Sequence, residues 1–213
     1  MLKSRAAAGA AVLARRLLAP LIAKSAADII RERASLAAVA ELAARAECSR
    51  VDVAAALRRV TSIDSHIGCD AISTVPPLVF GWRGAGAACM AQLALDKVPP
   101  EQRPSAQFAV PMVTLIEHVD GNASGHPGLI HGGMTAVMAQ TAASLAAALN
   151  AAPGAAVGPR ALNMDYRKPI RTGSFVKIHA WPYELRPGGL RAAVHIYGLG
   201  GEVLVEATAD LAV

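Results

Sequence analysis

The 213-residue sequence has few aromatic side chains and few cysteines. Aromatic residues make up 4% of the chain, and Cys48, Cys69 and Cys89 are widely spaced, with no Cys-x-x-Cys pair among them. A disulfide-stapled scaffold is therefore excluded, and we expect three reduced, mostly buried thiols. Hydrophobic residues nevertheless amount to 54% of the chain. A disordered chain is excluded too, because it lacks the apolar residues that form a core.

Acidic residues are absent from positions 1–27, and this absence accounts for the net charge of +5. Five of the 21 basic side chains lie in this segment, which leaves 16 basic against 16 acidic side chains in the rest of the chain. The basic character therefore belongs to the N-terminus, and the remainder carries no surplus of positive charge for nucleic acid. We expect no nucleic-acid partner.

The N-terminal segment has an amphipathic helical pattern, with four leucines on one side of the wheel and arginines on the other. An acid-free, Arg- and Ala-rich pattern of this kind is typical of a mitochondrial transit peptide, which we expect at residues 1–27. A membrane-surface anchor and an ordinary surface helix are the alternatives. A transmembrane span is not expected, because Arg15, Arg16 and Pro20 interrupt the apolar run.

Residues 28–62 are expected to form a helical extension, with one helix over 28–46 and a second over 49–60. The main domain is placed at 63–213. There the pattern predicts strands separated by turn residues, at 85–95, 107–118, 161–166, 175–184, 190–197 and 203–211. Glycines at 188–189 and 198–201 predict hairpin turns, so the last three strands form an antiparallel meander.

A single helix is expected at 132–150, between the second and third of these strands. Its sequence is alanine-rich and apolar all round, which is typical of a buried helix. The predicted fold class is α+β, an antiparallel sheet curled around a central helix.

Two sequence blocks support this arrangement. Residues 125–136 read GHPGLIHGGMTA, and residues 162–169 read LNMDYRKP. Together, in this order and at this separation, they resemble the hotdog-fold thioesterase superfamily, and most closely its acyl-CoA thioesterase branch, over residues 78–213. The resemblance implies a homodimer or dimer of dimers, an acyl-CoA substrate, and no cofactor apart from the coenzyme A moiety of that substrate.

The start of the central helix suits thioester chemistry. The first N–H groups of a helix are unpaired and lie at its positive end, so Gly132 and Gly133 are candidates for an oxyanion hole. His131 is a candidate to orient this turn or to bind the thioester. Packing is the alternative for His131, and also for Met134, which is a candidate to border an acyl channel. The candidates for the rest of the substrate lie in the second block or just after it: Asn163, Arg167, Lys168 and Arg171.

Two positions depart from the family pattern. Gln140 stands where the resemblance implies an acidic residue that activates water, and Pro159 stands where close relatives carry a threonine. An amide cannot take a proton from water, whereas a general base contributes about 10²–10⁴ in rate. Two hypotheses therefore remain: an acyl-CoA hydrolase, and an acyl-CoA-binding or scaffold protein that has lost the carboxylate.

The spacing along the helix bears on assembly. Gly133 and Gln140 are separated by a rise of about 10.5 Å, so position 140 cannot serve a carbonyl bound at residue 133 of its own chain. A second chain must bring it there. The sequence contains no metal-ligand spacing and no Gly-x-Ser-x-Gly, Gly-x-Gly-x-x-Gly or P-loop motif.

Overall fold

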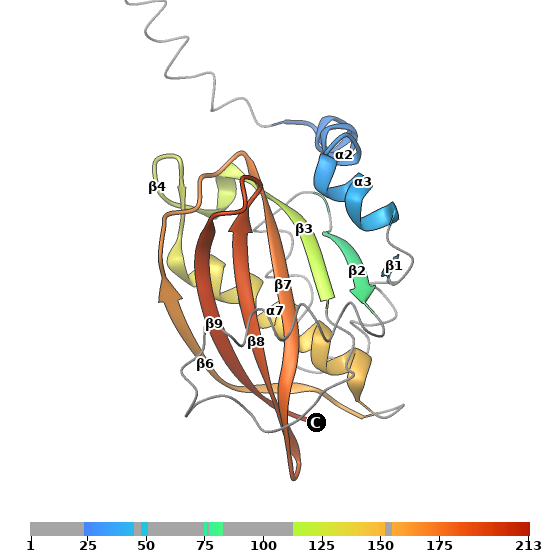
Figure 1. Cartoon of the computed structure of the whole chain (residues 1–213). Coiled ribbons are helices and arrows are strands. Elements are labelled where there is room, and N and C mark those ends of the chain that lie inside the picture. Colours follow the sequence, from blue (N-terminus) through green and yellow to red (C-terminus); the bar gives the residue numbers. More distant parts are fainter. Residues whose placement is uncertain (1–23, 45–47, 51–74, 76, 83–112, 152–154) are drawn as a thin grey trace, which may run out of the picture.

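The computed structural model describes residues 24–44, 48–50, 75, 77–82, 113–151 and 155–213. Seven strands form one antiparallel sheet in the order β1-β2-β3-β7-β8-β9-β6 (Figure 1). Their bounds are β1 Cys48–Arg50, β2 Leu78–Trp82, β3 Val113–Val119, β6 Gly158–Tyr166, β7 Ser174–Arg186, β8 Gly189–Gly198 and β9 Val203–Ala212. A separate small hairpin pairs β4 Ser124–His126 with β5 Leu129–Ile130. The 3₁₀ helix η3 Gly121–Ala123 precedes it.

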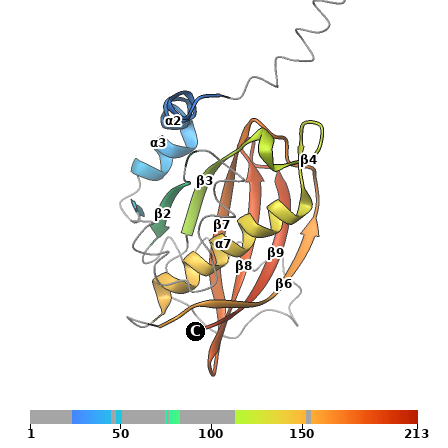
Figure 2. The same ribbon diagram turned by 180° about the vertical axis from the view of Figure 1, so that it is seen from behind.

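The central helix α7 Gly132–Asn150 crosses one face of this sheet, behind the strands in Figure 1 and in front of them in Figure 2. Residues 141–148 are buried throughout, because small alanine side chains let the helix lie close to the sheet. The predicted helix and the α+β class with a sheet around it are confirmed. Among the described helices, α7 alone is long and apolar enough to span a membrane, but 61% of it is buried in the protein, as in a core helix.

Successive side chains along each strand point to opposite sides, so the sheet has two faces. On β7, Val176, Ile178 and Ala180 pack into the core beneath α7. The odd-numbered neighbours Phe175 and Trp181 join a second cluster on the outer face. β7, β8 and β9 form the predicted meander, and Gly188 adopts a φ of 68° in the first turn, a conformation that favours glycine.

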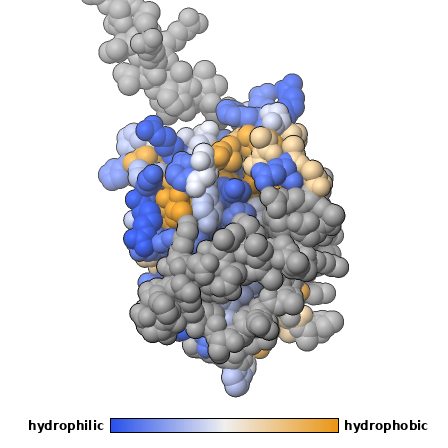
Figure 3. Space-filling model, in the orientation of Figure 1, coloured by the Kyte–Doolittle hydropathy of each residue, from blue (hydrophilic) through white to orange (hydrophobic). Residues whose placement is uncertain are grey.

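Two short helices pack on the outer face of the sheet, α2 Ala26–Ala34 and α3 Ala37–Ala44. Ile29 and Leu42 are their buried anchors, and they belong to the same cluster as Ile116 of β3. The prediction of one continuous helix over 28–46 is wrong, because Ser35 ends α2: its hydroxyl donates to the carbonyl of Glu32 at 2.7 Å. In Figure 3 the alanine-rich α3 presents a hydrophobic surface, and the left edge of the described surface is largely hydrophilic.

The remaining differences concern strand positions. The predicted helix over 49–60 is wrong at its start, since Ser49 and Arg50 pair with β2 as part of β1. The sheet therefore includes residues that precede position 63. β2 was missed. β3 contains residues 113–118 of the predicted strand 107–118, whereas residues 107–112 and the predicted strand 85–95 lie outside the described residues. Most of the expected transit peptide also lies outside them, at 1–23.

Candidate functional site

The candidate turn lies where β5 leads into α7, and three contacts hold His131 in place there. Its backbone N–H donates to the carbonyl of Ala123 at 2.8 Å, and its ring Nδ1 accepts the N–H of Gly133 at 2.9 Å. Gly125 lies against it so closely that a Cβ there would come within 2.9 Å of His131 Cα. Because Nδ1 is an acceptor, the neutral ring carries its proton on Nε2. His131 is thus the N-cap of α7.

The two glycines of the turn have different roles. The N–H of Gly133 is occupied by the His131 ring, and a Cβ on Gly133 would lie 3.1 Å from that Nδ1. The N–H groups of Met134 and Thr135 both donate to the carbonyl of His131. The N–H of Gly132 has no acceptor among the described residues. Gly132 is therefore the donor available to an anion or carbonyl oxygen at the helix start.

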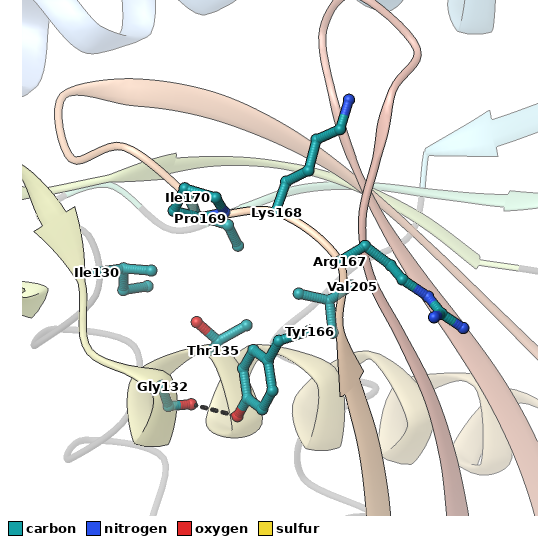
Figure 4. A pocket seen from close by; sticks show the side chains of 9 residues that line it. All are labelled: Ile130, Gly132, Thr135, Tyr166, Arg167, Lys168, Pro169, Ile170 and Val205. Atoms are coloured by element: carbon teal, nitrogen blue, oxygen red, sulfur yellow. Dashed lines mark hydrogen bonds between the residues drawn. The ribbon is translucent and has the colours of Figure 1, made fainter.

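A cavity of about 300 Å³ opens beside Gly132 (Figure 4). Aliphatic side chains from β5, β9 and the β6–β7 connection form its apolar wall: Ile130, Pro169, Ile170 and Val205. Two hydroxyl groups also line it, those of Thr135 and Tyr166. The Tyr166 hydroxyl donates to the carbonyl of Gly132 at 2.9 Å. Both hydroxyls were missed as site residues from the sequence alone, although Tyr166 belongs to the second block and Thr135 to the first.

The three basic candidates differ in what they contact. Arg167 donates twice to Glu206, at 2.8 and 2.9 Å, and forms an ion pair with Asp165. The hydrogen bond to Glu206, together with the charges of both acids, raises the pKa of Arg167 above its usual value. Lys168 lines the cavity, whereas Arg171 is exposed three residues further along the chain and outside the cavity lining. Neither forms an ion pair within the described parts of the chain. Lys168 and Arg171 are therefore the cations that an incoming anion can reach first.

Part of the chain matches a known protein family. Residues 127–205 match the family model described as thioesterase superfamily. This segment belongs to the thioesterase superfamily. It contains α7 with its His131 cap, the cavity and most of the meander. A comparison with curated proteins found no match.

Solved structures similar to about half of this chain carry related descriptions. One is described as a thioesterase superfamily protein and is 22% identical, with a TM-score of 0.43. The match covers 48% of this chain and 51% of the other chain. A hypothetical thioesterase from Streptococcus pneumoniae, solved with coenzyme A, is 16% identical over 47% of this chain and 77% of its own, with a TM-score of 0.43. A phenylacetic acid degradation protein from Thermus thermophilus is 20% identical, with a TM-score of 0.43. The match covers 47% of this chain and 84% of the Thermus chain. The chain thus spans about half the length of the first of these structures.

Three other candidates of the thioesterase-superfamily segment lie away from the cavity lining. Gln140, half-buried on α7, donates its amide N–H to Ser144 Oγ at 3.2 Å. Met134 is half-buried against the core. Asn163 is exposed on β6, on the face opposite Met164, which packs against the core. The roles predicted for these residues stay predictions.

The sheet also buries a carboxyl group beneath α7. Glu117 on β3 points to the same face as Leu115 and Val119, beneath α7, and is 4% exposed. Desolvation raises the pKa of Glu117 to about 7. On the opposite face, burial lowers the pKa of His179 to about 3, with the charges of Lys177 and His195 adding to the effect. His179 Nδ1 lies 2.7 Å from the hydroxyl of Thr114.

No group of three metal-ligating side chains occurs among the residues that the structure describes.

Proposed function

We propose that this protein binds acyl-CoA thioesters with the thioester carbonyl at the start of α7, and hydrolyses them. The observation that carries the proposal is the N–H of Gly132, which has no acceptor within the described ranges. It lies at the positive end of a 19-residue helix and on the wall of a cavity. A helix N-terminus stabilises negative charge, which is what a thioester oxygen acquires when water adds to its carbon.

The two ends of the ligand meet different surfaces. The aliphatic wall around Ile170 and Val205 takes an apolar portion next to the thioester. Lys168 and Arg171 take phosphate groups at the rim, and in Figure 4 the Lys168 side chain extends away from Thr135 and Gly132. Arg167 is less suited to this role, because a phosphate has to compete with Glu206 and Asp165.

The reaction needs one water and no further reactant. The water oxygen forms a bond to the thioester carbon, and the carbonyl electron pair moves to the oxygen that Gly132 holds. When this intermediate collapses, the C–S bond breaks and the sulfur leaves with its electron pair. One water proton ends on the sulfur and the products are a carboxylic acid and free coenzyme A.

A second function, binding without appreciable hydrolysis, is favoured by Gln140. Its amide cannot remove a proton from water, and it is already hydrogen-bonded within its own helix. A free-thiol assay over a panel of acyl-CoA chain lengths, paired with calorimetric titration of coenzyme A, separates the two. Thiol release supports the hydrolase, and binding without thiol release supports the second function. If the protein shows neither thiol release nor binding, both functions are contradicted.

Removing Lys168 or Arg171 should weaken coenzyme A binding more than removing Arg167. We expect Lys168→Ala and Arg171→Ala each to raise the Kd for coenzyme A by about threefold to tenfold, the range for an exposed charge-assisted contact. Arg167→Ala is the matched control, because it removes the same charge from a side chain that Glu206 and Asp165 already hold. Titration calorimetry at constant ionic strength measures all three. A larger loss in Arg167→Ala than in the other two would contradict this assignment.

The proposed site also requires a second copy of the chain. Position 140 lies about 10.5 Å along α7 from Gly133, and β6 is the last strand of the described sheet, where a partner strand can add. We expect a chain beginning at residue 24 to be a dimer or larger by light scattering at micromolar concentration. A monomer that is fully folded by circular dichroism would contradict the expectation.

A further inference from the structure

We propose that the hydroxyl of Thr135 is a second hydrogen-bond donor to the thioester oxygen, beside the N–H of Gly132. This inference rests on the proposed function. Thr135 is 2% exposed, yet it lines the cavity. Burying a hydroxyl on the wall of a largely apolar cavity costs free energy unless it forms a hydrogen bond with a ligand or with the protein.

Helix geometry places this hydroxyl level with the first turn. Residues three apart on a helix lie on the same face, and their side chains lean toward the helix N-terminus. Thr135 therefore leans back toward Gly132, and its Oγ1 comes within 3.4 Å of the carbonyl oxygen of His131. In Figure 4 the hydroxyl of Thr135 projects into the space between Gly132 and Ile130. We place the thioester oxygen in this space, because Gly132 and Thr135 both line the cavity.

The hydroxyl is also available for a ligand. The His131 carbonyl already accepts the N–H groups of Met134 at 2.9 Å and of Thr135 at 3.1 Å. These two bonds use both lone pairs of that oxygen, so the third contact, from the Thr135 hydroxyl at 3.4 Å, is weak and easily exchanged. The other hydroxyl of the cavity differs, since Tyr166 donates to Gly132 at 2.9 Å. Of these two hydroxyls, Thr135 is the one free to turn its proton toward a carbonyl.

Two coenzyme A analogues test the inference without depending on turnover. One is a ketone analogue of hexanoyl-CoA in which a methylene replaces the thioester sulfur, so that it keeps the carbonyl and cannot be hydrolysed. The other is S-hexyl-CoA, which has no carbonyl. In the full chain, Thr135→Val should weaken binding of the ketone by about fivefold, the usual effect of one neutral hydrogen bond, and leave S-hexyl-CoA unchanged. Thr135→Ser should bind both ligands as the unaltered protein does.

Thr141→Val is the matched control, because Thr141 is a buried threonine of the same helix that does not line the cavity. It should change the affinity for neither ligand. Equal affinity of Thr135→Val and the unaltered protein for the ketone overturns the inference and leaves the proposed function standing. A parallel loss for both analogues also overturns it, since that result reports altered packing. If neither analogue binds the unaltered protein, the proposed function fails and this inference fails with it.

Discussion

Replacing Gln140 by aspartate should create or raise acyl-CoA hydrolysis, by at most about 10²–10⁴. The substitution supplies a carboxylate at the position where the superfamily pattern has an acid, and the Gly132 turn that would hold the thioester oxygen is intact. Gln140→Glu preserves the side-chain length but can place the carboxylate a methylene too far, so both variants are needed. Steady-state release of free thiol from acyl-CoA measures the gain.

The control for this prediction is Gln140→Asn, which shortens the side chain without adding a base and should leave the rate unchanged. Thermal melts must accompany the kinetics, because a carboxylate beside the apolar core can be protonated or destabilising. Folded, dimeric Gln140→Asp and Gln140→Glu that bind coenzyme A yet hydrolyse no faster than the parent would show that position 140 is not at the reacting carbon.

Pro159→Thr should help only when an acid is present at position 140. Pro159 is exposed on β6, next to a bulge between positions 159 and 161, where the sheet tolerates proline. A threonine hydroxyl and an aspartate that act on the same water molecule have non-additive effects on the rate. We therefore expect a gain from Pro159→Thr in the Gln140→Asp background and none in the parent.

Replacing Glu117 by glutamine should make the protein more stable at alkaline pH, by about 3 kcal/mol relative to the parent. The pKa of Glu117 is raised from 4.5 to about 7 by burial. Between these two values the unfolded chain loses the proton and the folded chain keeps it. The stability that this group contributes is therefore complete below pH 4.5, falls as the pH rises toward 7, and stays low above it. Glutamine avoids the loss because it never ionises.

The quantity to compare is the difference in the free energy of unfolding between variant and parent at each pH. The difference is needed because His179 changes the stability of both proteins with pH in the direction opposite to Glu117. Its pKa is lowered to about 3 by burial, so its contribution is complete above the ordinary value of 6.5 and is lost as the pH falls toward 3. Between pH 4.5 and 6.5 the two contributions have opposite slopes of about 1.4 kcal/mol per pH unit and cancel. The parent should therefore show a flat profile there, whereas Glu117→Gln should gain stability with rising pH.

Urea denaturation at intervals from pH 4.5 to 8.5 measures these profiles. Glu202→Gln is the matched control, since Glu202 is an exposed residue of the β8–β9 turn, and it should follow the parent. A constant difference between Glu117→Gln and the parent across this range would mean that Glu117 keeps an ordinary pKa in the folded protein.

The sequence by itself predicted the centre of the molecule. The helix over 132–150 was predicted with the bounds it has, because its apolar composition and the turn before it are local features. The meander of the last three strands follows in the same way from alternation and from glycines at the turns. Two short blocks, the turn at His131 and the strand ending at Tyr166, were enough to indicate the superfamily.

Tertiary structure decided which groups of that site are available. Both glycines after His131 are equivalent in the sequence. Only the structure shows that the imidazole accepts the N–H of Gly133, whereas no described residue accepts the N–H of Gly132. Arg167 and Lys168 are adjacent bases, and only the register of β6 against β9 brings Glu206 to Arg167. Glu117 reads as an ordinary strand residue, and it is buried because the sheet curls around α7 at that point. Local patterns determine where helices and strands form, whereas hydrogen-bond partners and burial depend on residues far apart in the chain.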